Sequence, residues 1–376
     1  SNKPFIGMEE EEEEIKIPFA LPGVHFVKEL GKGAQGRVIL VRSDQYGLGA
    51  LKYSRIGSKA KYENHDLVIE AQCGPALGDH PHIIKVLASG NVVKGIYRYL
   101  YVLLELHQGD LEKWNQTRMH PKSQLQQFKW TKEGHDVLNH EETMLKLMAL
   151  QISSALDHMQ RRGYIHRDIK PLNMGLAWDE KEPYKPRLIL CDFGFTRKIT
   201  DEKGQLVRPQ DRGFEPSTTY AYASPNTLRD EPQYYLDDAY NLLFSLIRDH
   251  FVDSKHALVC YHEYMDDYPA QAKQKDAFMK DPVKYVSRLK KGDKLADLPP
   301  WLVHMIQAIK TENPVELVDY KELNKLIDPP EIRPVTLSIP SSPAATDVVD
   351  DDDLFALSPP SSTPKKLPRN DSVVLY

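Results

Sequence analysis

An eight-residue string at 166–173, His-Arg-Asp-Ile-Lys-Pro-Leu-Asn, constrains this chain more than any other feature. It places a carboxylate (Asp168), a cation (Lys170) and an amide (Asn173) close together along the chain. Asp168 can orient an attacking hydroxyl, Lys170 can neutralise charge that grows on a group in transfer, and Asn173 can bind a divalent cation through its amide oxygen. The string also satisfies each fixed position of a known catalytic-loop pattern, so chance is a poor explanation.

A second signal, Asp192-Phe193-Gly194, follows the strand-like stretch 188–191. The tripeptide alone is common by chance, but here it stands 24 residues after Asp168 (192 minus 168) at a strand end. A carboxylate is a hard oxygen ligand that suits Mg²⁺. Asp192 and Asn173 are therefore the predicted magnesium ligands.

A third signal lies between two strand-like stretches, where Gly31, Gly33 and Gly36 precede Val38. Residues without a Cβ let backbone N–H groups come close to phosphate oxygens. Alone the motif is weak, because a flexible hairpin turn would show the same pattern. A dinucleotide site would need a helix to follow directly, and the residues after Gly36 are strand-like instead.

Lys52 stands on the third strand-like stretch, where a lysine can hold the α and β phosphates of a nucleotide. Its predicted partner is Glu70, on the helix that follows. Glu63 is a weaker choice, since it lies near the helix start, where an acid simply favours the helix dipole.

The periodicity of apolar residues divides the chain into a strand-rich half and a helix-rich half. β-Branched and aromatic stretches predict five strands of a mostly antiparallel sheet, at 24–30, 37–41, 49–53, 83–87 and 97–106. A helix is expected at 64–77. After Gly109, apolar residues at three-to-four spacing predict helices over 145–159, 236–250, 300–310 and 320–327. The expected fold class is α+β, with two lobes.

The two ends of the chain differ in composition from the part between them. The run Glu9 to Glu14 predicts a solvated acidic arm over 1–17. Beyond 329 the chain is rich in Pro, Ser and Asp, which predicts a disordered tail over 329–376. The folded domain would then cover 18–328, with lobes at 18–106 and 109–328.

Composition excludes several functional classes. A net charge of −5 argues against a nucleic-acid binder driven by bulk charge. The three cysteines are widely separated, without metal-ligand spacing or a disulfide framework. No apolar run is long enough to cross a bilayer, and no coiled-coil seam appears. We therefore expect a monomer in the cytoplasm or nucleus that binds neither nucleic acid nor membrane.

Together these residues resemble the protein kinase superfamily over 19–329, most closely the casein kinase 1 group and its tau-tubulin kinase-like branch. The narrower likeness rests on Val68-Ile-Glu-Ala71, His80-Pro-His-Ile83, Leu103-Leu-Glu-Leu106 with Gly109-Asp-Leu-Glu112, Tyr222-Ala-Ser-Pro-Asn226, and Asp237-Asp238. The resemblance implies a bilobal enzyme that uses ATP and Mg²⁺ to phosphorylate Ser or Thr in protein substrates. It also implies that Asp238 supports the catalytic loop.

The same resemblance implies the remaining site residues. Gly31, Gly33, Gly36 and Lys52 would bind the nucleotide phosphates, and Thr219 would contact Asp168 through its hydroxyl. The residues expected around the adenine are Leu30, Val38, Ala50, Leu104, Glu105, His107, Gly175 and Cys191.

Three positions depart from the family pattern. Gly175 stands where the family usually has Leu or Ala beneath the adenine, which predicts a thinner floor and a larger pocket. Thr218 replaces a Gly, and Ala221 replaces an Arg that helps the group bind phosphorylated or acidic substrates. A preference for acidic or primed sites is therefore carried over only weakly.

A nucleotide-binding pseudokinase is the main alternative. Pseudokinases typically lack the strand lysine, the catalytic aspartate or the metal-binding aspartate. Here Lys52, Asp168, Asn173 and Asp192 are all present, which favours an active enzyme. A dinucleotide oxidoreductase is a more distant alternative.

Overall fold

The computed structural model describes residues 17–33, 36–57, 65–114, 141–179, 182–207, 220–250, 258, 267–289, 294–309 and 316–327. These residues divide into two compact units. The sheet unit comprises 17–57 and 86–106, and the helical unit comprises 65–85 and 107–327, each within the described ranges. Thr219, most of the predicted acidic arm and the predicted tail lie outside the described residues.

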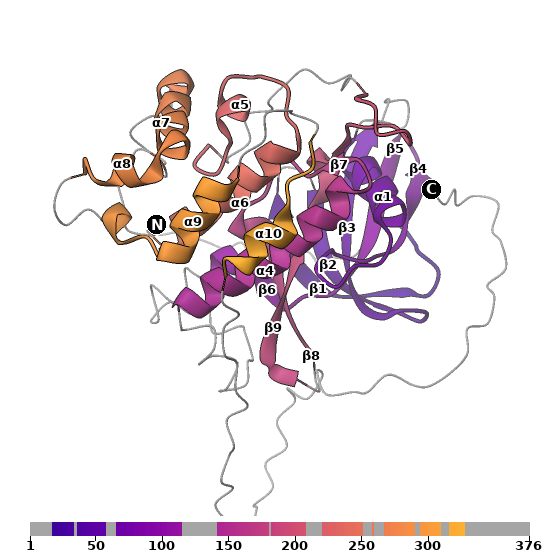
Figure 1. The fold of residues 1–376 in the computed structure, drawn as a ribbon. Helices are drawn as coiled ribbons and strands as arrows, with labels where there is room; N and C mark the ends of the chain where they lie inside the picture. The colour runs from indigo at the N-terminus through magenta and orange to yellow at the C-terminus, as the bar shows by residue number, and fades with distance from the viewer. Residues whose placement is uncertain are drawn as a thin grey trace, which may run out of the picture. The chain divides into compact units, whose positions relative to one another are not determined.

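The sheet unit is one antiparallel sheet in the strand order β1-β2-β3-β5-β4 (Figure 1). Its strands are β1 (Val24–Gly33), β2 (Gly36–Ser43), β3 (Gly47–Gly57), β4 (Val86–Lys94) and β5 (Tyr97–Glu105). The predicted five-stranded sheet is confirmed, but only residues 86–87 of the predicted fourth strand, 83–87, belong to β4, which continues to Lys94. Ile83 and Ile84 are apolar because they pack in the helical unit, where the Ile84 amide donates to the Leu190 carbonyl over 2.9 Å.

One face of this sheet forms an apolar core around Phe19. Alternate residues of a strand point to opposite faces, so the residues on this face recur at every second position. The ring of Phe19 lies edge-on to Tyr53, with centroids 5.4 Å apart. The other members of the cluster are Ile39, Val41, Leu51, Tyr99, Tyr101 and Leu103. The residues between these positions lie on the opposite face of the sheet and do not belong to this core.

The helical unit contains the predicted helices with small changes at their ends. They are α1 (Asp66–Leu77), α4 (Glu141–Gln160), α6 (Tyr235–His250), α9 (Pro300–Ala308) and α10 (Tyr320–Lys325). The sequence did not predict α5 (Pro225–Leu228), α7 (Tyr268–Lys280) or α8 (Pro282–Val286). Helix α4 packs against both α6 and α10, and the three lie together in Figure 1.

Short strands in the helical unit hold the ends of its functional loops. Strands β6 (Gly109–Asp110), β8 (Met174–Asp179) and β9 (Glu182–Leu190) form one small sheet, and β7 (Tyr164–Ile165) pairs with β10 (Arg197–Lys198). The loop 166–173 therefore begins where β7 ends and closes where β8 begins. The segment 191–196 likewise runs from β9 to β10.

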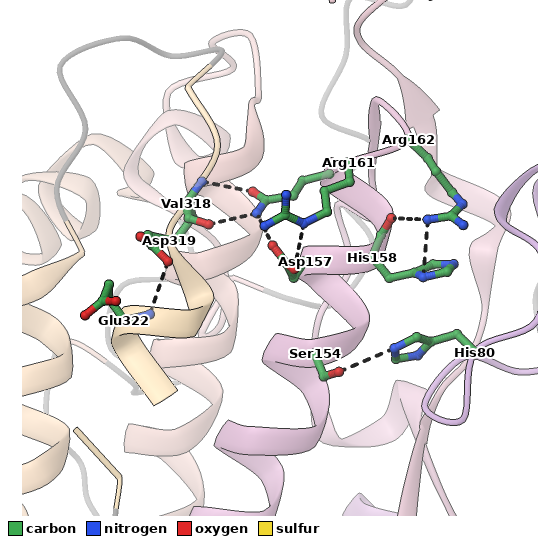
Figure 2. Close-up of polar contacts among 10 residues, drawn as sticks. His80, Ser154, Asp157, His158, Arg161, Arg162, Val318, Asp319 and Glu322 are labelled. Carbon is green, nitrogen blue, oxygen red and sulfur yellow. Dashed lines mark hydrogen bonds and ion pairs between the residues drawn. The ribbon is translucent and has the colours of Figure 1, made fainter. Parts of the chain in front are cut away.

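Polar contacts fix the end of α4 that leads into β7 (Figure 2). The amide of Gln160 donates to the Val318 carbonyl over 2.7 Å, and its oxygen accepts the Val318 amide over 2.9 Å. His158 donates to the carbonyl of Leu77, the last residue of α1, over 2.7 Å. These bonds join α4 to α1 and to the chain before α10, so the start of the loop 166–173 is held from two sides.

Within the described ranges, no helix combines the length and the apolar character needed to cross a bilayer.

Candidate active site

The backbone at the start of the loop 166–173 is clamped by a carboxylate from α6. The two oxygens of Asp238 accept the amide protons of His166 and Arg167, over 2.6 Å and 2.8 Å. Arg167 has φ 75, in the left-handed region that is costly for a residue with a side chain. The two bonds to Asp238 offset that cost, so the carboxylate holds the loop in a conformation it would otherwise leave.

Asp168 is fixed from two sides by its neighbours in the loop. The ammonium of Lys170 lies 2.7 Å from Oδ2 of Asp168, and the amide nitrogen of Asn173 donates to the same oxygen over 2.8 Å. The Asn173 amide also donates to the Asp168 carbonyl over 2.8 Å. All three side chains are buried. A buried carboxylate held in this way has little freedom to turn, which suits a group that orients a reactant.

His166 orders the loop through its ring. Its Nε2 donates to the Cys191 carbonyl over 3.1 Å, its Nδ1 accepts the Asp168 amide over 3.3 Å, and the ring meets Phe193 edge-on. Burial lowers the pKa of His166, so the ring is neutral near pH 7. Its contacts are those of a structural residue that links the loop 166–173 to the segment 191–196.

Asn173 and Asp192 suit a hard divalent cation. Because the Asn173 nitrogen is committed to Asp168, its Oδ1 is the atom left to face a cation. The Cys191 amide donates to the Asn173 carbonyl over 2.9 Å, which brings the residue before Asp192 beside Asn173. Asp192 itself has φ 62, another left-handed conformation that the neighbouring contacts must hold. An amide oxygen and a carboxylate are ligands that Mg²⁺ prefers, so these residues fit the ion.

Position 194 has no room for a side chain, because α1 lies close to its backbone. A Cβ at this position would lie 2.7 Å from the Cβ of Asp66, the first residue of α1. Helix α1 packs against the short 3₁₀ turn Phe193–Phe195 and carries the buried Glu70. The placement of Glu70 thus depends on the segment that contains Asp192.

On the sheet unit, one face collects the predicted nucleotide residues. Val38 lies directly opposite Lys52 across β2 and β3, and Ala50 lies directly opposite Leu104 across β3 and β5. Lys52 and Ala50 are two positions apart on β3, so all four share a face. This face is opposite the one that packs around Phe19. Four residues predicted from separate stretches therefore meet on one surface.

The remaining predicted residues of the sheet unit lie at its strand ends. Gly33 of β1 pairs with Gly36 of β2, and Gly31 pairs with Val38. Leu30 falls at an irregularity in the β1 register and is partly exposed. Glu105 ends β5.

A family model for the protein kinase domain matches residues 24–248, more than half of the chain. The chain belongs to the protein kinase domain family. It is 30% identical over 183 residues to serine/threonine-protein kinase SBK2 of rat, which covers 48% of this chain and 42% of that protein. Ribosomal protein S6 kinase alpha-3 of mouse is 28% identical over 135 residues, 35% of this chain and 15% of that protein. The chain therefore spans less than half the length of these curated relatives.

Gly175 of the kinase domain does not border open space. A Cβ there would lie 2.8 Å from Cγ of His107, whose ring is held by a 3.0 Å bond from Nδ1 to the Gly109 carbonyl. The sequence predicted a thinner floor and a larger pocket at this glycine. Instead the His107 ring occupies the volume that a larger side chain would take.

The contacts of two buried residues of the kinase domain, Asp237 and Lys275, were not predicted from the sequence. Asp237 accepts from the Ser224 hydroxyl over 2.5 Å and from the Tyr234 amide over 2.7 Å, while its neighbour Asp238 holds the loop. Lys275 is fully buried on α7. The sequence pattern that could have indicated its burial is the helical spacing of α7. Lys275 stands three or four residues from the buried Ala272, Phe278 and Met279.

Proposed function

We propose that this kinase domain transfers the γ-phosphate of ATP to Ser or Thr hydroxyls of proteins. The observation that carries the proposal is the buried Asp168 carboxylate, fixed by Lys170 and Asn173. ATP bound with Mg²⁺ supplies the phosphoryl group and part of the charge neutralisation. The family generally uses both.

The residues of this chain have separate parts in the proposed reaction. Asp168 accepts the hydrogen bond, and finally the proton, of the substrate hydroxyl, and so points its oxygen at the phosphorus. Lys170 balances the charge on the transferred group. Asn173 and Asp192 would bind Mg²⁺ through oxygen atoms, and Lys52 would bind the nucleotide phosphates.

A transfer assay with labelled ATP, Mg²⁺ and an acidic protein such as casein tests the function. Asp168→Asn keeps the size of the side chain but cannot accept the proton, so we expect its rate to fall by about a hundredfold or more. Asp297→Asn is the matched control, because Asp297 is an exposed carboxylate of the same unit. Equal rates from wild type and Asp168→Asn would instead indicate a nucleotide-binding pseudokinase.

We also propose that the domain is closest in type to the casein kinase 1 group and its tau-tubulin kinase-like branch. Support comes from Ser224-Pro225-Asn226, whose Ser224 and Asn226 both bond to Asp237, and from the Asp237-Asp238 pair. A peptide library tests this proposal, because the branch predicts selection of acidic or primed Ser and Thr sites, which should be weak here since Ala221 replaces an Arg of the group. Selection of basic sites would contradict it.

A further inference from the structure

Helix α7 buries a lysine that the proposed reaction does not use. Lys275 has no exposed surface, and it lies between buried residues on the face that α7 turns inward. A fully buried lysine is rare in proteins and requires partners, since removing an ammonium from water is costly. Burial accordingly lowers the pKa of Lys275 well below its usual value. The partners that offset this cost identify what the residue does.

The ammonium of Lys275 meets three backbone carbonyls of one short segment. Its Nζ donates to the carbonyls of Tyr220, Ala221 and Ala223, over 3.1, 3.0 and 2.6 Å. A protonated lysine has three N–H donors, which matches these three acceptors. The ammonium also lies 4.2 Å from the centre of the Phe244 ring, an arrangement that favours the charged form. All three N–H donors bind backbone carbonyls, so Lys275 holds the backbone of the segment 220–223 in place.

Further contacts fasten the same segment to α7. The rings of Tyr220 and Tyr268 are stacked with centroids 4.2 Å apart. Ala223, Leu228 and Ala272 form a small apolar cluster, and Arg229 pairs with Asp276. The beginning and the end of the stretch 220–229 are therefore both attached to one helix.

The segment is also linked to the catalytic loop by buried polar bonds. It leads into Ser224, whose hydroxyl donates to Asp237, and the adjacent Asp238 accepts the amides of His166 and Arg167. A displacement of 220–223 would therefore move Ser224 relative to the loop that carries Asp168. A protein whose hydroxyl reaches Asp168 needs a fixed backbone beside that loop, and 220–223 is tied to it through adjacent residues of α6.

We propose that Lys275 is a positioning residue for the protein substrate, which sets the backbone of 220–223 against the catalytic loop. This inference rests on the proposed kinase function. Lys275 itself touches neither the substrate nor the nucleotide in this role. Its loss should therefore weaken the use of protein substrate while the use of ATP is kept.

Steady-state kinetics on the full chain test the proposal with two variants and a control. Lys275→Met has a similar length but no donors, and Lys275→Gln retains two N–H donors. Loss of charged hydrogen bonds predicts that KM for the protein substrate rises about tenfold in Lys275→Met and by a smaller factor in Lys275→Gln. KM for ATP should stay at the wild-type value in both. Lys273→Met, at an exposed lysine of the same helix, should match wild type throughout.

Amide hydrogen exchange supplies a readout that does not depend on activity. We expect faster exchange at 221–228 in Lys275→Met, with the amides of His166 and Arg167 still protected. Were Lys275→Met to fail to fold, the same two measurements on Lys275→Gln would decide. Unchanged substrate KM and unchanged exchange would overturn the proposal, as would an equal rise in both KM values. A wild-type chain without transfer activity would refute the proposed function, and exchange would then decide whether Lys275 orders the segment.

Discussion

The sheet unit and the helical unit differ in what they bury. Among its described residues, the sheet unit buries polar side chains only at Ser43, Ser89 and Asn91, none of them charged. The described helical unit buries seven Asp, Glu or Lys side chains, namely Glu70, Asp110, Asp168, Lys170, Asp237, Asp238 and Lys275. Buried charges are costly unless they are paired, so each needs partners. A cavity in the apolar core of the sheet unit should therefore lower mainly stability, whereas loss of a buried charge in the helical unit should lower activity as well as stability.

The largest expected effect follows from removing the clamp on the catalytic loop. Asp238→Ala leaves the amides of His166 and Arg167 buried without acceptors, at a cost of about 3 to 5 kcal/mol in the free energy of unfolding. We expect phosphoryl transfer to fall by about a hundredfold or more in the molecules that remain folded, since the loop leaves its left-handed turn. Urea unfolding and a transfer assay at low temperature measure the two effects.

The matched control for this change is Glu202→Ala, at an exposed acidic residue of the same unit. It should alter neither quantity. If Asp238→Ala lost stability but kept the wild-type rate per folded molecule, the contrast between the units would break down.

A cavity in the sheet unit should give the opposite pattern. Leu51 is fully buried in the core around Phe19, and Leu51→Ala should lower the free energy of unfolding by about 2 to 4 kcal/mol. At a temperature where the variant is folded, its transfer rate should stay near wild type. Ile96→Ala, at a residue that is 72% exposed, is the control and should shift stability by about 0.5 kcal/mol or less. A large loss of rate in Leu51→Ala with little loss of stability would reverse the comparison.

The buried carboxylates predict a pH dependence. Burial raises the pKa of Asp237 to about 6 and that of Asp238 to about 7, from an ordinary value of 3.8. The folded chain therefore keeps protons that the unfolded chain releases. The contribution of Asp237 and Asp238 to the free energy of unfolding is complete below pH 3.8 and is lost as the pH rises through 6 and 7. Burial lowers the pKa of His166, so this histidine contributes the opposite slope.

The contribution of Asp237 to the pH dependence of stability can be measured by comparing wild type with Asp237→Asn. Between pH 4 and 6, wild type should lose about 1.4 kcal/mol per pH unit relative to Asp237→Asn, because the variant lacks one titrating group. Urea midpoints at four pH values give this difference. Parallel curves for the two proteins would show that Asp237 does not titrate in this range.

The smallest expected effect concerns Gly175 and His107. Gly175→Ala places a Cβ against the ring and should cost about 1 kcal/mol in stability. His107→Ala removes the ring, so the double variant should lose less than the sum of the two single changes. Additive losses in this double-mutant cycle would mean that the ring moves aside at no cost.

The sequence predicted the parts of the site that depend on short spacing. The string 166–173 predicted Asp168, Lys170 and Asn173, which lie together because the loop is short. The resemblance to the kinase family implied Val38, Ala50, Lys52 and Leu104 as nucleotide-binding residues, and the structure places all four on one face of the sheet. Five strands could be predicted because each is a β-branched or aromatic stretch bounded by turn residues. The fourth was placed too early in the sequence, because the apolar residues Ile83 and Ile84 belong to the helical unit.

Features that depend on contacts between distant segments could not be predicted in this way. Nothing near Gly175 indicates that the ring of His107 fills its neighbouring space. Lys275 lies about fifty residues from the carbonyls it binds, and a lone lysine in a polar helix is usually solvated. The β8–β9 hairpin was missed except for 188–191, because its first strand follows the catalytic loop without a turn signal.

The bond from Asp238 to the His166 amide also governs when the active loop can exist. It spans 72 residues, so it closes a long loop whose entropy must be overcome before the bond forms. A ribosome-bound chain that has not yet released α6 already carries the whole string 166–173, but lacks the carboxylate that holds Arg167 in its left-handed turn. We therefore expect phosphoryl transfer to appear only after α6 has left the ribosome. A shorter nascent chain would then modify nothing around it.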